Sequence, residues 1–273
     1  MALYDMNDFD LSVFFRPALN HMMVRVCLFL SLCFGMKSQI SAQNHLAIHI
    51  PSPEEEAEYV WRTIQDIRFF EQYKYPVNLP EHPLIDTLIR RCKQNRLSDA
   101  SFPELVQLIK SDIYQKEDYQ AAARKIDQQL PLINRMIHHL KKMRFRWEFH
   151  SFDQYRVRLT LYGSGGSFNP DDGSLILLTT PQGSFRQYPN PANTIIHEII
   201  HIGIERAIVQ KYELAHPVKE RIVDGIMLIL FSDLLPDHRI QQIGSSKIND
   251  YLNKKREVKR LDKVIEQFLE ETR

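Results

Sequence analysis

Beyond residue 52, the first half of the chain repeats apolar side chains at the three- and four-residue spacing of amphipathic helices. The pattern predicts four helices, over residues 53–73, 81–95, 102–115 and 117–143. Pro53 and the glutamates that follow it favour the amino end of the first helix, whereas Pro131 is a point at which the fourth could break. Residues 43–52 have no such spacing and are interpreted as an extended linker.

The pattern changes near residue 145, where apolar and polar residues begin to alternate as they do in half-buried strands. From there the sequence predicts three strands, at residues 145–149, 157–161 and 174–180, and then three helices, from Pro191, from Pro217 and over residues 246–272. Glycine, asparagine and aspartate crowd residues 163–173, which predicts a turn-rich loop before the third strand.

This order of elements predicts an α+β fold, with a small, mostly antiparallel sheet packed on the helix that begins at Pro191. The predicted domains are a helical region at residues 43–144 and a second domain at residues 145–273 that contains the sheet.

The charge balance of the chain argues against one class of partner, nucleic acid. Lysine and arginine number 35 against 34 acidic residues, so the charges nearly cancel. The sequence shows no basic patch with interleaved aromatic residues, and nucleic acid is therefore not an expected partner.

The amino terminus resembles a secretory leader. The apolar run at residues 24–36 includes Arg25 near its start, and Ile40, Ser41 and Ala42 resemble a signal-peptidase site with cleavage before Gln43. Residues 1–42 are thus predicted to be a signal peptide with an over-extended start, since Met22 or Met23 would be a more usual first residue. The mature protein would be secreted or periplasmic. The alternative is an uncleaved membrane anchor.

The cysteines fit either compartment. Cys27 and Cys33 fall within the predicted leader, and Cys92 alone remains in the mature chain. No intramolecular disulfide is then possible, and Cys92 is interpreted as a structural or incidental thiol.

His197, Glu198 and His201 form an H-E-x-x-H motif inside the helix predicted from Pro191. Side chains four residues apart lie on one face of a helix, so both imidazoles can approach one metal ion. Isoleucines surround the motif, which predicts a buried helix. Buried polar groups need partners, and a zinc ion would provide one. The alternative is a core helix whose histidines bond to backbone carbonyls.

A catalytic zinc ion has three protein ligands and one open position. Eighteen residues separate His201 from Glu220, enough for the first helix to end and the second to pack beside it. We predict Glu220 as the third ligand, with Asp224 and His216 as the alternatives. Asp224 follows Glu220 by one helical turn and is predicted to accept the other ring N–H of a ligand histidine.

The H-E-x-x-H motif, the eighteen-residue interval, Glu220 and the further E-x-x-x-D pattern together resemble the gluzincin metallopeptidases, over about residues 155–235. The resemblance implies a zincin-like fold in which an edge strand lines the cleft and can bind an extended peptide. Residues 174–180 are the candidate edge strand, with an ordinary buried strand as the alternative. The chain has no G-x-M-E-N signature and is shorter than the M1-type aminopeptidases, so no subfamily is assigned.

The resemblance implies hydrolysis of a peptide or protein substrate by a zinc-activated water, with Glu198 as the general base. The developing oxyanion needs a further hydrogen-bond donor. Four side chains are candidates, namely Tyr212, His216, His238 and Tyr251. The alternative function is a catalytically silent, zinc-stabilised binding or scaffolding protein of the cell envelope, in which the helical region would be the interaction surface.

Overall fold

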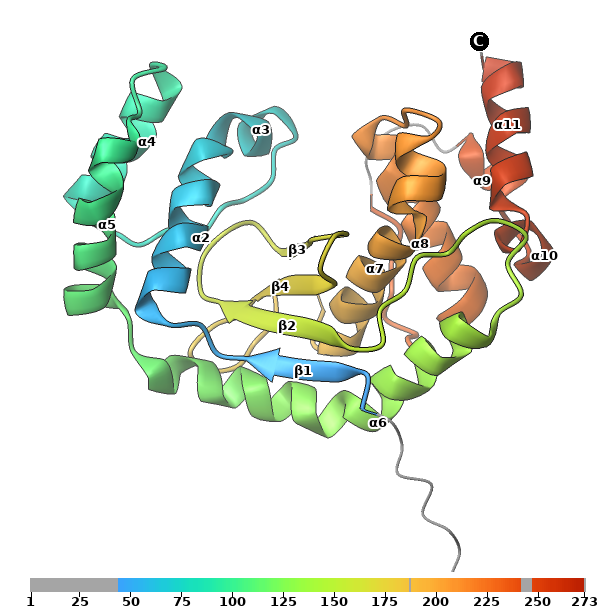
Figure 1. Cartoon of the computed structure of the whole chain (residues 1–273), viewed down its shortest axis with the longest axis horizontal. Helices are drawn as coiled ribbons and strands as arrows, with labels where there is room; N and C mark the ends of the chain where they lie inside the picture. Colours follow the sequence, from blue (N-terminus) through green and yellow to red (C-terminus); the bar gives the residue numbers. More distant parts are fainter. Residues whose placement is uncertain (1–43, 187, 242–246, 273) are drawn as a thin grey trace, which may run out of the picture. The chain divides into compact units, whose positions relative to one another are not determined.

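The computed structural model describes residues 44–186, 188–241 and 247–272, all within one compact unit (Figure 1). The predicted signal peptide, residues 1–42, lies outside the described residues. Among the helices that the structure describes, none is long and apolar enough to span a bilayer.

The amino-terminal half is mostly helical, as predicted, but opens with a strand. Its main elements are β1 (Leu46–His49), α2 (Pro53–Gln65), α3 (Ile67–Gln72), α4 (Pro83–Lys93), α5 (Phe102–Leu108) and α6 (Gln120–Lys142). Short 3-10 helical turns adjoin them at Asp99–Ser101 and Lys116–Tyr119, and a π-helical turn lies at Ile109–Ile113. The carboxyl-terminal half holds β2 (Tyr155–Thr160), β3 (Gly166–Phe168), β4 (Ser174–Leu178), α7 (Pro191–Ile204), a π-helical turn at Glu205–Gln210, α8 (His216–Phe231), α9 (Ile248–Tyr251), α10 (Lys255–Val258) and α11 (Leu261–Thr272).

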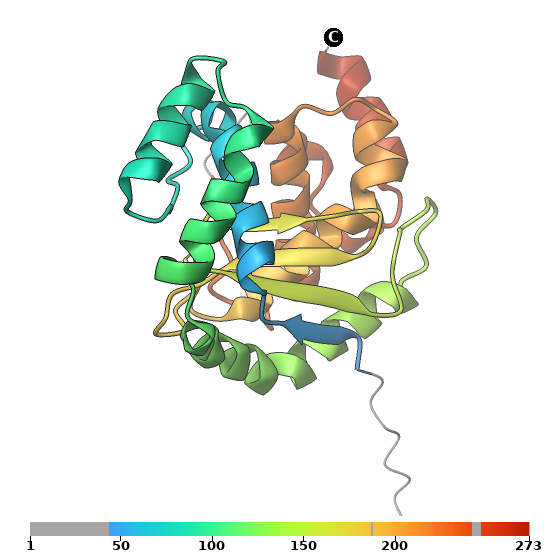
Figure 2. The same cartoon turned by 60° about the vertical axis from the view of Figure 1, so that its left-hand side comes forward.

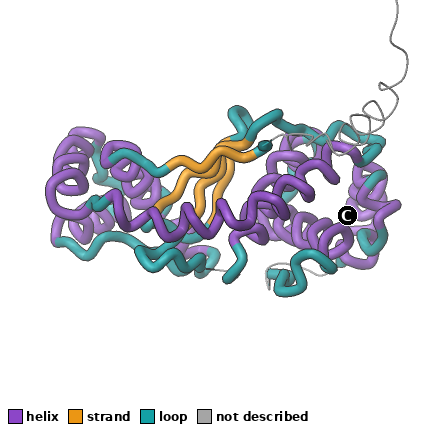
Figure 3. Tube along the Cα trace, turned by 90° about the horizontal axis from the view of Figure 1, so that it is seen from below, coloured by secondary structure: helices purple, strands orange, loops and turns teal. Residues whose placement is uncertain are grey.

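The described strands form one four-stranded sheet in the order β1-β2-β4-β3. Figure 3 shows the strands side by side, with helices around them. β1 pairs with β2 and β2 with β4 in parallel, and only β3 and β4 are antiparallel. The fold is therefore α+β, as predicted, but the expectation of a mostly antiparallel sheet is wrong. Helices separate β1 from β2 along the chain, and long connections of this kind permit parallel pairing.

The edge of the sheet beside the helices α7 and α8 is β3, not the strand predicted for this position. β4 occupies most of the predicted 174–180 segment but lies between β2 and β3. β3 has only three residues and falls inside the glycine-rich segment, whose composition indicated a turn. The other edge strand, β1, falls inside the predicted linker.

Residues 145–149 are not a strand, although their apolar residues alternate. Their backbone and side chains bond to helical segments instead: Arg146 N donates to Lys259 O at 2.8 Å, and Trp147 Nε1 donates to Val258 O at 3.0 Å. Phe145 and Phe149 stack with ring centroids 4.8 Å apart and pack against the core. The alternation thus reflects aromatic packing rather than pairing in the sheet.

Several predicted helices are divided. The helix predicted over 53–73 breaks at Asp66, between α2 and α3, and the charged helix predicted over 246–272 consists of α9, α10 and α11. Glu257 explains one of these breaks, because its carboxylate accepts the backbone N–H groups of Asn253 and Lys254 and so starts α10 anew. In contrast, α6 continues through Pro131.

Two hydrophobic clusters stabilise the unit. The larger one joins the inner face of the sheet to α6, α7, α8 and the carboxyl-terminal helices, and α6 crosses beneath β1 in Figure 1. The smaller one joins α2, α4 and α5, which Figure 2 shows side by side. β1, from the predicted helical region, pairs with β2 from the other half, so the sheet itself connects the two halves.

Glu56 on α2 also connects the two halves. Its Oε1 accepts hydrogen bonds from Tyr119 Oη at 2.8 Å, Thr160 Oγ1 at 3.1 Å and Leu161 N at 2.9 Å. Glu56 is buried, and burial raises the pKa of its carboxyl above the ordinary 4.5 despite these donors. A carboxyl whose pKa is higher in the folded state stabilises folding most when it is protonated.

We expect the Glu56→Gln variant to fold and to change the pH dependence of stability. Glutamine keeps an acceptor oxygen but does not titrate, so the free energy of unfolding of the variant should rise relative to that of the wild type as the pH increases above 4.5. Urea denaturation between pH 4.5 and 8 measures this difference. Exposed Glu58, on the same helix, provides the control Glu58→Gln. A pH-independent difference for Glu56→Gln would contradict the prediction.

Candidate metal centre

α7 carries the H-E-x-x-H motif into the protein interior. Asn190 Oδ1 accepts a hydrogen bond from Ala192 N at 3.0 Å, and a proline follows at the first helical position, so the helix begins where the sequence predicts. Every residue of α7 is buried. His197, Glu198 and His201 are therefore removed from water and need polar partners.

α8 provides those partners. It begins at His216 and packs against α7, and its residues Glu220 and Asp224 are both buried. Because they are four residues apart, the two carboxylates lie on the same face of α8. That face is turned toward α7, where both carboxylates contact His197.

Three ligand atoms converge between the two helices. His197 Nε2 lies 3.0 Å from His201 Nε2, and each of these atoms lies 3.2 Å from Glu220 Oε2. Atoms that bind one tetrahedral zinc ion at bond lengths of 2.0–2.1 Å are about 3.3 Å apart. The spacing of this buried nitrogen–nitrogen–oxygen set is thus suited to a single metal ion.

The electrostatics of the set also fit a cation. Burial opposes ionisation of Glu220, but the charge of the neighbouring histidines outweighs it and holds the pKa of this carboxyl well below its usual range. Burial likewise disfavours charge on His197, but Asp224 and Glu220 raise its pKa to about 10, whereas burial lowers the pKa of His201 to about 4. An anionic carboxylate oxygen therefore faces two imidazole nitrogens in a buried site, an arrangement in which a divalent cation could take the place of a proton.

Asp224 contacts the opposite side of the His197 ring. Its Oδ1 lies 3.4 Å from His197 Nδ1 and 3.3 Å from His238 Nε2, and these three residues form a second buried group with ligand-like spacing. A carboxylate at Nδ1 fixes the tautomer that leaves Nε2 free to bind a metal. Asp224 thus lies where the sequence predicts an orienting carboxylate. His238 in turn contacts Asp224.

Gln241 holds both carboxylates of α8. Its backbone N–H donates to Asp224 Oδ2 at 2.7 Å, and its side-chain Nε2 donates to Glu220 Oε2 at 3.0 Å. One residue from a loop after α8 therefore restrains Glu220 and Asp224 together, and lies beside the oxygen that faces the histidines.

β3 covers the set from the other side. The Phe168 ring stacks on the His201 ring, with centroids 5.0 Å apart and planes 5° apart, and Lys219 Nζ lies 5.2 Å from the centroid of the same phenyl ring. A β-carbon at Gly166 would collide with Oε1 of Glu198, so only glycine allows this close approach of strand and carboxylate.

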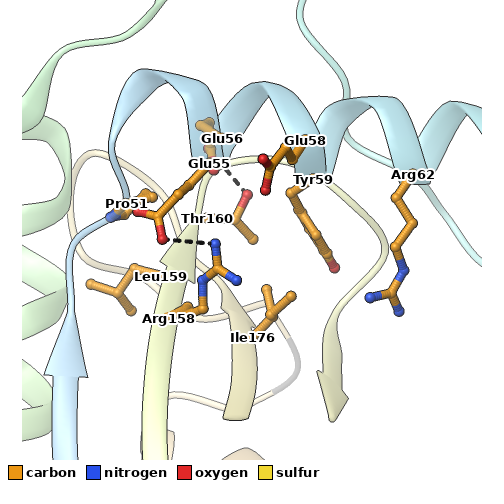
Figure 4. A pocket seen from close by; sticks show the side chains of 10 residues that line it. All are labelled: Pro51, Glu55, Glu56, Glu58, Tyr59, Arg62, Arg158, Leu159, Thr160 and Ile176. Carbon is orange, nitrogen blue, oxygen red and sulfur yellow. Dashed lines mark hydrogen bonds and ion pairs between the residues drawn. The ribbon is translucent and has the colours of Figure 1, made fainter. Parts of the chain in front are cut away.

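A cavity of about 410 Å³ opens over the ligand set. α2 and α3 line one wall, the segment from Ser164 to Phe168 lines another, and His197, Glu198, His201 and Glu220 lie where α7 and α8 reach it. A smaller cavity of about 130 Å³ adjoins it and shares Tyr59 and Arg62 (Figure 4). In Figure 4, Tyr59 and Arg62 both extend from α2 toward β3.

The structure separates the four predicted oxyanion donors. His216 lines the large cavity, with Nδ1 3.6 Å from Glu220 Oε1. His238 contacts Asp224 behind the ligand set, and its ring stacks with that of Tyr188. Tyr212 and Tyr251 bond to glutamates of α11 and are not among the residues that line the cavity.

Several cavity residues escaped the sequence analysis. Tyr75 Oη lies 2.8 Å from His216 Nε2, although 141 positions separate these residues in the chain. Gln241 and Phe168 carry no recognisable motif. Of these residues, Gly166 alone could have been recognised in the sequence, because a glycine in a strand can mark a close approach of the backbone to another group.

We expect the three converging residues to bind the metal. Glu220→Ala and His201→Ala should each weaken Zn²⁺ binding by more than the 10–100-fold that loss of an orienting partner typically costs, and Asp224→Asn should fall in that 10–100-fold range. Titration calorimetry with Zn²⁺ on the metal-stripped protein measures the affinities. Exposed His138 provides the control His138→Ala, which should bind as the wild type does. Unchanged affinity in Glu220→Ala would exclude Glu220 as a ligand.

The described site thus combines a ligand set for a metal ion, a buried carboxylate beside it and a cavity large enough for a segment of a substrate. Its geometry is the basis for a proposal about function. No protein-family model, curated protein or solved structure matches the chain.

Proposed function

We propose that the protein is a zinc-dependent peptidase of gluzincin-like type that hydrolyses a peptide bond by an activated water. The observation that carries this proposal is that Glu198 lines the same cavity as the three ligand residues His197, His201 and Glu220. A purely structural metal site is closed by four protein ligands and has no use for a free carboxylate beside it. The silent scaffolding protein is therefore the weaker alternative.

The donor set favours zinc among the divalent ions. Two imidazole nitrogens and one carboxylate oxygen are a common catalytic zinc set, and a set of oxygens alone would have favoured magnesium or calcium. When bound, zinc would supply a Lewis acid that polarises the substrate carbonyl and lowers the pKa of water. His197, His201 and Glu220 would hold it, and Asp224 and Gln241 would orient two of these ligands.

Glu198 would act as the proton carrier. Its carboxylate accepts a proton from the attacking water as the water oxygen bonds to the carbonyl carbon. The same group then delivers that proton to the amine nitrogen as the carbon–nitrogen bond breaks, so that the products are a carboxylic acid and an amine. The close approach of Gly166 to Glu198 keeps the edge of β3 beside this transfer.

Tyr75 is our candidate for the oxyanion donor. It lines the cavity together with His216, and the two side chains are in hydrogen-bond contact. Burial raises the pKa of Tyr75 to about 12, so its hydroxyl keeps its proton at neutral pH. With a proton on His216 Nε2, the imidazole donates to the tyrosine oxygen and leaves the hydroxyl proton free to point into the cavity.

The proposed location follows from the leader. If residues 1–42 are removed as a signal peptide, the peptidase acts in the periplasm or outside the cell. Its substrate would then be a peptide or protein of that compartment.

The Glu198→Gln variant tests the proton carrier. We expect it to bind Zn²⁺ as tightly as the wild type and to lose peptide hydrolysis, because an amide cannot accept the proton from water. Cleavage of a quenched-fluorescence peptide library, together with metal analysis of the same samples, measures both properties. Glu148→Gln changes an exposed glutamate and should retain activity. Full activity in Glu198→Gln would refute the mechanism.

The Tyr75→Phe variant tests the oxyanion donor. Loss of one donor to a developing oxyanion commonly lowers kcat by about 100-fold or more, so we expect a fall of that order with little change in KM. Zn²⁺ affinity should stay unchanged because Tyr75 contacts no ligand atom directly. The matched variant Tyr73→Phe removes a neighbouring hydroxyl that does not line the cavity and should keep kcat. Equal kcat values for the two variants would show that Tyr75 has no such role.

A further inference from the structure

Phe69 is exposed in an unusual place. Phe69 is 40% exposed to solvent. No other large apolar residue among residues 44–186, 188–241 and 247–272 is as exposed. It does not lie on an open outer surface but lines the cavity over the metal centre, with Phe70 beside it on α3. An apolar side chain that stays in water at a concave site is typical of a surface that a ligand covers.

Phe69 belongs to an aromatic cluster that consists of Phe69, Phe70, Tyr73, Tyr75 and His216. The Phe69 ring centroid lies 4.9 Å from that of Tyr73 and 5.4 Å from that of His216. These are the distances of favourable edge-to-face contacts, so the rings hold one another in place. The cluster is therefore a preformed surface rather than a set of mobile side chains.

The cluster adjoins the ligand set directly. His216 contacts the Tyr73 ring at 5.0 Å on one side, and its Nδ1 lies 3.6 Å from Glu220 Oε1 on the other. His216 alone therefore separates Phe69 from the predicted ligand Glu220, and a group that covers Phe69 would lie close to the candidate metal centre. The rest of the same wall carries the polar side chains of Arg62 and Thr63 on α2 and of Asp66, which follows α2. On this wall, the phenyl rings therefore lie at the α3 end.

Backbone pairing anchors this wall. Asn78, three residues after Tyr75, exchanges backbone hydrogen bonds with Gly163 at 2.8 and 2.7 Å. Gly163 leads into β3, which forms the opposite wall. The distance between the aromatic cluster and the edge strand is thus restrained by main-chain contacts.

We propose that the part of the aromatic cluster that lines the cavity, Phe69 with Phe70 and Tyr75, is its specificity subsite, and that it binds an aromatic or large aliphatic side chain next to the scissile bond of a peptide substrate. The proposal rests on the proposed function and names its substrate class. An apolar side chain would bury the exposed face of Phe69 against Phe70 and Tyr75, while the polar α2 wall contacts the rest of the peptide. A charged side chain at that position would lose its hydration without gaining a partner on the α3 side.

The test compares peptides that differ at one residue. Peptides that are otherwise identical carry Phe, Leu, Ala or Asp at each position flanking the scissile bond, and kcat/KM is measured for the Zn²⁺-loaded wild type, Phe69→Ala and Phe102→Ala. Phe102 also belongs to the helical half but does not line the cavity, so its variant controls for loss of a phenyl ring. We expect the wild type to prefer Phe over Ala at one position by at least tenfold, the order of discrimination that apolar pockets achieve.

Phe69→Ala should reduce this preference to less than about threefold, mainly by slowing cleavage of the Phe peptide, whereas Phe102→Ala should keep it. Because Phe69 is exposed, its truncation should leave the fold intact, as circular dichroism and an unchanged Zn²⁺ affinity would verify. A wild type that cleaves peptides without preference for apolar residues would overturn the subsite. So would a preference that survives in Phe69→Ala.

A second measurement separates the subsite from catalysis. Titration calorimetry of the same peptides into Zn²⁺-loaded Glu198→Gln records binding without turnover, and the double variant Glu198→Gln/Phe69→Ala should lose the preference for Phe. If the wild type cleaves no peptide but this binding preference is present and depends on Phe69, the proposed hydrolysis fails and the subsite stands. If neither cleavage nor preferential binding is found, the subsite is refuted as well.

Discussion

The contact between α7 and α8 is the constraint on which the rest of the structure depends. α7 is buried along its whole length, and yet it carries two histidines and a glutamate into the interior. Such groups are costly to bury unless charged or polar partners meet them. The two histidines meet such partners from α8, because Glu220 contacts both of them and Asp224 contacts the other side of the His197 ring. The two helices can therefore pack in few other registers, because a shift would leave a buried carboxylate without a partner.

This polar contact also explains the shape of its surroundings. On one side of the ligand set, Asp224 contacts His197, His238 contacts Asp224, and Gln241 donates hydrogen bonds to Asp224 and Glu220. On the other side, the cavity extends between α2, α3 and the short strand β3, whose Gly166 passes close to Glu198. A side chain at Gly166 would displace the Glu198 carboxylate. Rigid support on one side and space on the other are what a reactive site requires.

The sequence was informative where the chemistry is local. Side chains at i and i+4 on a helix share a face, so the pairs His197 with His201 and Glu220 with Asp224 follow from helical geometry alone. Caps such as Asn190 mark where a helix begins. The sequence was uninformative where contacts are distant. β1 is four residues long and pairs with a strand more than a hundred positions away, and Tyr75 reaches His216 across 141 positions. No periodicity encodes such pairs, since they depend on how complete elements pack.

The distant contacts are nevertheless what makes one site out of two halves of the chain. The ligand residues all belong to the second half, whereas α2 and α3, which form the facing wall, belong to the first. The contacts that hold the halves together include β1 paired with β2, Asn78 paired with Gly163, and Glu56 bonded to Thr160 and Leu161. Each joins the first half to β2 or to the segment between β2 and β3, and hence to the strand that covers His201. The sheet and the hydrogen bonds of the buried Glu56 therefore connect the wall that carries Phe69 to the half of the chain that carries the candidate metal centre.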